Sequence, residues 1–185
     1  EGATSRLADA RAQREQDEAR LIQRALLPTA LPALRGIRIA AMWNPASGFG
    51  GDCYDVIRFS ADEAERVGIT VADVAGKGLP AALLMSNLQA AVRAFASETS
   101  TPRDVATSVN RLLCRNIAVG KFVSFFYLVI DRARGMLTFA NAGHNPPFLL
   151  RADGRRTTLD ATGIPFGIDE TALYANAEIA LDPGD

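Results

Sequence analysis

The sequence contains little that would indicate a disulfide-bonded, thiolate-metal or membrane protein. Cys53 and Cys114 are the only cysteines in 185 residues, and they form no CxxC pair. So few cysteines exclude a disulfide framework and favour a reducing compartment. No apolar run approaches the roughly 18 residues that a membrane span needs, and the N-terminus lacks the basic stretch and apolar core of a signal peptide. We therefore expect a cytoplasmic chain without a membrane span.

Excess charge and histidine are also lacking. The 20 basic and 21 acidic side chains leave a formal net charge of −1, and no basic patch with interleaved aromatics occurs, so we expect no nucleic-acid partner. His144 is the only histidine, which excludes a histidine-based zinc site. It lies in the turn-like stretch "NAGHNPP", where we favour a structural role over a catalytic one.

The N-terminal segment has the composition of a long helix. Residues 3–27 are rich in Ala, Leu, Arg, Glu and Gln, which are strong helix formers, and Pro28 and Pro32 end the pattern. A heptad seam of mostly small residues follows steps of four and three: Ala8, Ala12, Glu15, Ala19, Ile22 and Leu26. The seam is too short and polar to bury itself alone. Pairing with a partner and docking on the domain both remain open.

The remaining chain alternates between strand and helix patterns. Apolar alternation or continuous apolar runs predict strands over 36–43, 53–59, 67–74, 122–131 and 136–141, with short strands within 145–151 and 173–181. Helical spacing predicts one helix over 79–97 and a second that begins at Thr101, followed by Pro102 and Asp104. Strand hairpins on either side of two grouped helices predict an α+β fold rather than a βαβ series.

Two aspartates stand beside predicted strands and glycines. Asp73 closes an apolar strand, and Asp52 directly follows Gly50 and Gly51. Two acids from separate strands are the minimum for holding a hard divalent cation, because Mg²⁺ and Mn²⁺ prefer oxygen ligands. The spacing alone is equally compatible with two acids that only cap turns.

Other catalytic readings are weaker. The "GKG" at 76–78 is not a phosphate-binding loop, because Val71 and Gly78 stand where that motif requires Gly and Ser or Thr. Its glycines are expected to permit a tight turn into the following helix. Cys53 has no histidine nearby in sequence, so we interpret it as a packed thiol rather than a nucleophile.

Several blocks together make the chain resemble the PPM-type (protein phosphatase 2C-like) Ser/Thr phosphatases, in the bacterial branch typified by SpoIIE and RsbU. The similarity runs from about Gln23 to Asp185. Its blocks are "RALLP" at 24–28, "GGDCYDV" at 50–56, "ADVAGKGLPAALLMS" at 72–86, "FVSFFYLVID" at 122–131 and "NAGHNPPFLL" at 141–150. Five blocks in the right order are far more specific than any one of them.

The resemblance implies a fold and a domain division. We expect an αββα sandwich of two antiparallel sheets flanked by helices, with a linker helix at 1–28 and the phosphatase domain at 29–185. The family places its remaining metal aspartates in and beyond a later "TDG" segment, which these 185 residues do not contain. We therefore expect a domain without its C-terminal part and a chain that is inactive by itself. A longer natural protein and a degenerate family member both remain open.

The resemblance also implies site residues. It assigns two Mn²⁺ or Mg²⁺ ions to Asp52, Asp73 and the backbone carbonyl of Val74. Asp52 and Asp73 would serve catalysis by holding the ions that activate a hydrolytic water. The preceding glycine pair would let the backbone turn so that Asp52 faces the ions. Asp55 is expected to have a supporting hydrogen-bonding role.

The implied activity is hydrolysis of phosphoserine or phosphothreonine in signal transduction. In this branch the substrate is a phosphorylated STAS-type anti-anti-sigma factor, within bacterial sigma-factor control and the stress response. The helix at 3–27 would join an upstream sensor or receiver domain, and a homodimer is one arrangement left open. The alternative is a catalytically inactive, phosphatase-like module that binds a regulatory partner, which the missing aspartates favour.

Overall fold

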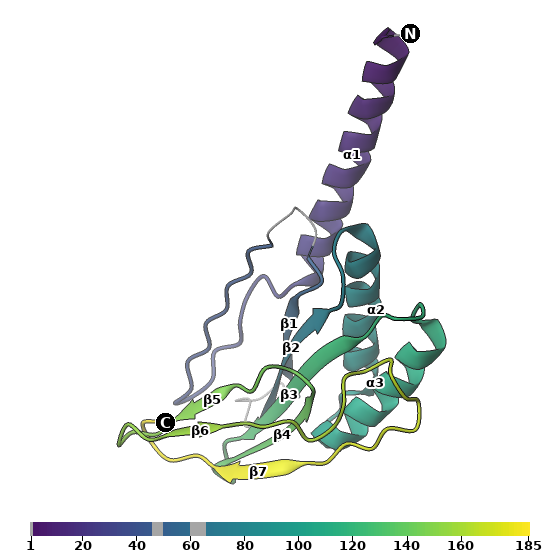
Figure 1. The fold of residues 1–185 in the computed structure, drawn as a ribbon. Coiled ribbons are helices and arrows are strands. Elements are labelled where there is room, and N and C mark those ends of the chain that lie inside the picture. The colour runs from purple at the N-terminus through teal and green to yellow at the C-terminus, as the bar shows by residue number, and fades with distance from the viewer. Residues whose placement is uncertain (1, 46–49, 60–65) are drawn as a thin grey trace.

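A computed structural model describes residues 2–45, 50–59 and 66–185, with side chains from Ala10 onward. The predicted helices are confirmed in this part of the chain (Figure 1). Their bounds are α1 (Gly2–Leu26), α2 (Leu79–Phe95) and α3 (Pro102–Asn116). α3 begins as the sequence predicts, because Thr101 and Asp104 form a reciprocal capping box with Pro102 at the first helical position.

The strands form antiparallel sheets. Their bounds are β1 (Cys53–Arg58), β2 (Arg66–Val74), β3 (Val123–Asp131), β4 (Met136–Ala142), β5 (Phe148–Leu150), β6 (Arg156–Thr158) and β7 (Ala177–Ala180). One sheet has the order β1-β2-β3-β4-β7, and β5 pairs with β6 in a second sheet. The predicted α+β class with adjacent hairpins is confirmed. β6, whose three residues are all exposed, was not predicted.

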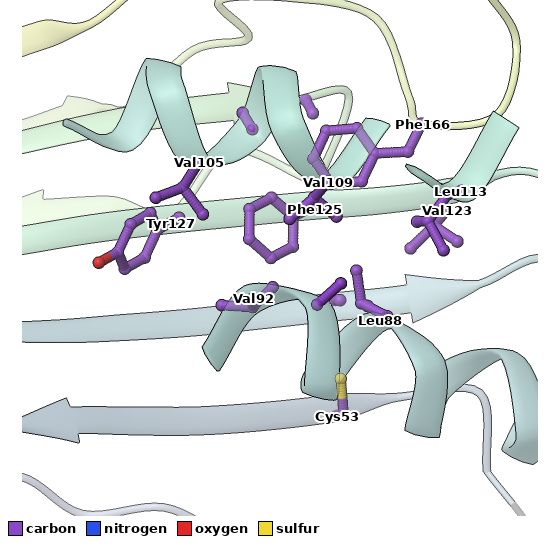
Figure 2. Packing of buried hydrophobic residues seen from close by; sticks show 14 of the residues in the cluster. Cys53, Leu88, Val92, Val105, Val109, Leu113, Val123, Phe125, Tyr127 and Phe166 are labelled. Atoms are coloured by element: carbon purple, nitrogen blue, oxygen red, sulfur yellow. The ribbon is translucent and has the colours of Figure 1, made fainter. Parts of the chain in front are cut away.

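The main core lies between the large sheet and the helices α2 and α3, which cover the same face (Figures 1 and 2). Alternate β3 side chains point to opposite faces, so Phe125 and Tyr127 pack under the helices, whereas Phe126 joins a separate cluster with Phe139. Both clusters are buried. This explains why β3 reads as a nearly continuous apolar run, as a strand covered on both faces should.

The predicted strand at 36–43 is wrong. Within the described residues this segment makes only an isolated bridge between Leu34 and Ile37, and β1 pairs with β2 alone. Ile37 and Ile39 are half-buried against a small cluster that contains Val67. Their alternation therefore reports one-sided packing of an extended segment, and it arises without a ladder of backbone hydrogen bonds.

Helix α1 projects from the body of the domain and contacts it with its C-terminal end (Figure 1). Gln23 and Leu27 are 3% and 6% exposed, whereas Leu21 and Ile22 are 69% and 66% exposed. The docked face is thus offset from the predicted seam, whose first position, Ala8, lies outside the described side chains. Within the described residues, none of the helices has the length and apolar character of a membrane span.

Candidate metal site

Asp52 and Asp73 come together at one end of the large sheet. Cys53, the first residue of β1, lies opposite Ala72 in β2, so the residue before β1 is placed beside the penultimate residue of β2. Both aspartates are exposed. The indole of Trp43 donates a hydrogen bond to the backbone oxygen of Asp52, with an Nε1–O distance of 3.0 Å. The backbone that carries Asp52 is therefore tied to the extended segment before it.

The strand register places the two carboxyl groups side by side, and the pKa of Asp73 reflects this. The pKa of Asp73 is raised above 3.8, first by burial and then by the charge of Asp52 and a hydrogen bond with its carboxyl group. His144 acts weakly in the opposite direction. Two like charges held side by side create a strongly negative point, which is the electrostatic requirement for a divalent cation.

The glycine pair before Asp52 provides space rather than an unusual turn. The backbone bends at Gly51, but neither Gly50 nor Gly51 has a positive φ, so the left-handed conformation is not what requires glycine here. A Cβ at position 51 would lie 2.6 Å from the carbonyl oxygen of Val74, and the Val74 amide donates to the Gly51 oxygen at 3.3 Å. Gly51 is required because the two backbones approach so closely, and this contact brings the Val74 carbonyl next to Asp52.

His144 also lies at this end of the sheet, near Asp73. The sequence analysis did not predict this proximity. Asp73 lies opposite Ser124 in the β2–β3 ladder, and the Ser124 hydroxyl is 2.8 Å from His144 Nδ1. The His144 amide donates to the side-chain oxygen of Asn141, which is fully buried. Burial lowers the pKa of His144, and the charges of Asp73 and Asp52 oppose that effect. The signal for this proximity is the strand register, which a single turn motif does not reveal.

Asp55 and Cys53 have structural roles in the same region. Asp55 is 2% exposed, and its carboxylate accepts hydrogen bonds from Arg93 Nε at 2.6 Å and Nη2 at 2.9 Å. This is the supporting hydrogen-bonding role that the sequence predicts. The pKa of the Cys53 thiol is raised to about 12, mainly by burial and then by nearby aspartates. Cys53 is therefore a packed thiol, as expected, because a thiolate would be needed for nucleophilic attack.

The "GKG" turn leads directly into α2. Gly76 and Gly78 have φ values of +122° and +76°, which side chains rarely adopt, and Gly78 is the N-cap of the helix. The amide of Ala82 donates to the Gly78 oxygen at 3.1 Å. The glycines thus serve the tight turn that the sequence predicts.

The donor atoms fit part of a divalent-metal site. Asp52, Asp73 and the Val74 carbonyl offer oxygen, which suits Mg²⁺ and Mn²⁺ rather than a thiolate-binding metal. Among the residues that the structure describes, however, no group of three or more His, Cys, Asp or Glu side chains is placed to hold a metal ion. The chain supplies two carboxylates, so a complete two-ion centre would need further ligands.

The fold, an antiparallel sheet covered by helices, is shared with solved PP2C-type phosphatase domains. The solved structure of the SiaA-PP2C domain of Pseudomonas aeruginosa matches the chain with a TM-score of 0.74 and 25% identity, covering 96% of this chain and 70% of that one. A solved structure of RsbX in complex with magnesium shares the fold at 15% identity and a TM-score of 0.57, covering 72% of this chain and 62% of that one.

The chain belongs to the SpoIIE family, whose profile, described as Stage II sporulation protein E, matches residues 63–185. The phosphoserine phosphatase RsbU of Bacillus subtilis is 32% identical over 165 residues, which are 89% of this chain and 48% of RsbU. The resemblance and the αββα fold class predicted from the sequence are thereby confirmed. The chain spans about half the length of that relative.

Proposed function

We propose that this chain is the phosphatase domain of a metal-dependent protein phosphatase that hydrolyses phosphoserine or phosphothreonine. One observation carries the proposal: Asp52, directly before β1, and Asp73, the penultimate residue of β2, lie side by side at one end of the large sheet although they are 21 positions apart in sequence. The chain is similar to RsbU, which is named a phosphoserine phosphatase, and this similarity supports phosphoserine as the substrate class.

In this proposal Asp52, Asp73 and the Val74 carbonyl hold two Mn²⁺ or Mg²⁺ ions. Bound ions would supply an activated water and neutralise charge on the phosphoryl oxygens. The residues of the chain position this chemistry. Gly51 keeps the Val74 carbonyl near Asp52, and the Ser124 hydroxyl fixes the His144 ring beside the acidic pair. The pKa of Cys53 keeps it a thiol, consistent with direct attack by water rather than a covalent enzyme intermediate.

The proposed biological substrate is a phosphorylated STAS-type anti-anti-sigma factor in the cytoplasm, within bacterial sigma-factor control. The proposed input is an upstream sensor or receiver domain joined through α1, with a homodimer as its natural arrangement. Two features support this input. Leu21 and Ile22 leave apolar surface on α1 uncovered in the single chain, and Gln23 connects α1 to the loop that precedes Asp52. On this proposal residues 1–28 are the linker and 29–185 the catalytic domain.

A second candidate function is a phosphatase-like binding module without turnover. The observation that favours it is the donor count, since only two carboxylates gather at the site within the described residues. A chain with an incomplete centre could still recognise a phosphorylated partner. The two functions differ in whether Mn²⁺ produces hydrolysis.

The test measures release of phosphate from p-nitrophenyl phosphate and from a serine-phosphorylated STAS protein, with and without Mn²⁺. It uses this chain and a version extended past Asp185 along its gene. Mn²⁺-dependent release by the extended protein, abolished by Asp73→Asn, supports the enzyme. If neither protein releases phosphate from either substrate, the enzyme function is contradicted and the binding module is favoured.

A further inference from the structure

A groove of about 480 Å³ opens beside the metal site, between the β2–α2 turn, α2 and the loop after α3. Its wall begins at Val74, the residue whose carbonyl lies against Gly51. Its size is within the roughly 300–1,000 Å³ of pockets that bind small ligands. The groove therefore adjoins the backbone of Val74, the candidate metal ligand that follows Asp73 in β2.

The two lysines of the chain both line this groove. The other 18 of its 20 basic residues are arginines, yet Lys77 and Lys121 come from the turn before α2 and the loop before β3 to face the same space. The Lys121 ammonium lies across Gly76, where a Cβ would meet Nζ at 2.8 Å. Within the described chain neither lysine forms an ion pair, and the described residues that line the groove include no acid.

The rest of the lining is mainly apolar. Leu83 is 63% exposed on α2, and Leu84 and Ile117 form the deeper wall. Leu79, the first residue of α2, and Phe122, directly before β3, are also exposed apolar residues, at 46% and 43%. An apolar trough with two unpaired cations matches a ligand that carries negative charge beside an apolar side chain.

We propose that this groove docks the phosphoserine-bearing segment of the protein substrate, with an apolar side chain next to the phosphoserine seated against Leu83. This proposal rests on the proposed function. A phosphoserine brings nearly two negative charges, which complement the two lysines while the phosphate faces Asp52 and Asp73 with their ions. The apolar contact would select among phosphorylated segments, because charge alone distinguishes them poorly.

The test uses two matched peptides that contain a non-hydrolysable phosphonate analogue of phosphoserine. One has leucine on both sides of the analogue, and the other has serine. Amine-selective labelling with mass-spectrometric readout follows Lys77 and Lys121, which carry the only side-chain amines in the chain. The leucine peptide, with Mn²⁺ present, should slow labelling of both lysines several-fold, and the serine peptide should protect them much less.

Matched variants make the test specific. Leu83→Gln should weaken binding of the leucine peptide about tenfold, as expected for losing part of one leucine contact. Leu173→Gln changes a leucine that is 84% exposed and does not line the groove, so it should leave the affinity unchanged. Lys121→Glu should weaken binding of both peptides, whereas Arg134→Glu in the β3–β4 turn should not.

Three results would overturn the proposal. The first is that the leucine peptide does not bind. The second is that it binds but leaves both lysines fully labelled. The third is that Leu83→Gln and Leu173→Gln weaken its binding equally. Labelling that falls with protein concentration alone would instead identify the occupant as a second copy of the chain. Hydrolysis of p-nitrophenyl phosphate by the version extended past Asp185 is measured separately, and the peptides are tested on the same extended protein. If that protein hydrolyses the substrate but its lysines stay unprotected, the proposed function stands and the docking groove is refuted. If the lysines are protected but nothing is hydrolysed, the groove stands and the proposed function is refuted.

Discussion

The side-chain amide of Gln23 binds both polar groups of the Gly50 residue. Gln23 Nε2 donates to the Gly50 oxygen at 2.5 Å, and the Gly50 amide donates to Gln23 Oε1 at 3.2 Å. Both residues are buried. This pair joins α1 to the backbone two residues before Asp52, so the position of α1 and the shape of the candidate metal site are physically connected.

Replacing Gln23 by Ala should destabilise the domain and weaken its response to Mn²⁺. The change leaves the buried amide and carbonyl of Gly50 without partners, which costs about 1–3 kcal/mol. Urea denaturation measures the free energy of unfolding. Gln13→Ala is the control, because Gln13 makes an exposed bond to Asp17 on the same helix and should cost less than about 0.5 kcal/mol. Equal losses in the two variants would refute a special role for Gln23.

Arg93→Met should destabilise the fold by about 3 kcal/mol, because it leaves the buried Asp55 carboxylate without its cation. The control is Arg103→Met. Both arginine side chains are 55% exposed, but the Asp104 partner of Arg103 is 51% exposed, whereas Asp55 is 2% exposed. The control should therefore cost at most about 1 kcal/mol. Chemical denaturation of both variants would contradict the prediction if Arg103→Met proved the more damaging.

Gly51→Ala should lower both stability and metal binding. The new Cβ would lie 2.6 Å from the Val74 carbonyl oxygen, so the two backbones must separate, at a cost of about 1–3 kcal/mol. Gly50→Ala is the comparison and should destabilise the protein less. Its Cβ would meet the Trp43 side chain at 3.2 Å, and a ring can shift more easily than a backbone carbonyl. The melting temperature with and without Mn²⁺ measures both effects. A Gly51→Ala protein with undiminished Mn²⁺ stabilisation would count against the assigned carbonyl.

On the proposed function, Asp73→Ala should reduce the phosphatase activity of the extended protein more than Asp52→Ala does, because the family resemblance assigns to Asp73 the position of the ligand that would serve both ions. We expect each variant to lose more than about 100-fold in activity. Replacing even a residue that only hydrogen-bonds a metal ligand typically lowers activity or metal affinity 10–100-fold. Asp160→Ala, at an exposed aspartate, should retain activity. Steady-state rates with saturating Mn²⁺ provide the measurement, and near wild-type rates in both site variants would remove the metal assignment.

The metal-free protein should become more stable relative to Asp73→Asn as the pH falls towards 3.8. The folded-state pKa of Asp73 is raised above 3.8, mainly by burial and then by Asp52, so the folded state binds this proton more tightly than the unfolded chain does. The stabilisation is fully present below pH 3.8 and is lost as the pH rises through the folded-state pKa. Urea denaturation in EDTA measures the difference between the two proteins. A difference that grows in the opposite direction would show that folding does not raise the pKa of Asp73.

Local sequence patterns predicted the local structure well. Thr101 and Asp104 are three residues apart, and their capping box depends only on that spacing and on the helix that follows. The run that forms β3 is apolar on both faces because two separate clusters cover it. The strand predicted at 36–43 is wrong because alternation of apolar residues indicates which side chains are buried. It does not reveal whether a neighbouring strand supplies hydrogen bonds.

The candidate site was predictable only in part. Asp52 and Asp73 were assigned through family motifs, and the strand register explains why they meet. The proximity of His144 was missed because it follows from β2–β3 pairing and the Ser124 hydroxyl, which no motif in "NAGHNPP" encodes. The close approach of Gly51 to the Val74 carbonyl was not predicted either. A sequence shows that glycine is present, but only the fold shows whether it is needed for backbone rotation or for close approach.

The shape of α1 has a mechanical consequence. Its 25 residues make a rod about 37 Å long, with its far end projecting away from the domain (Figure 1). The planar amide of Gln23 grips the backbone of Gly50 through both donor and acceptor. A rotation of the helix would therefore act on the Gly50 backbone, two residues before Asp52, through both of these hydrogen bonds.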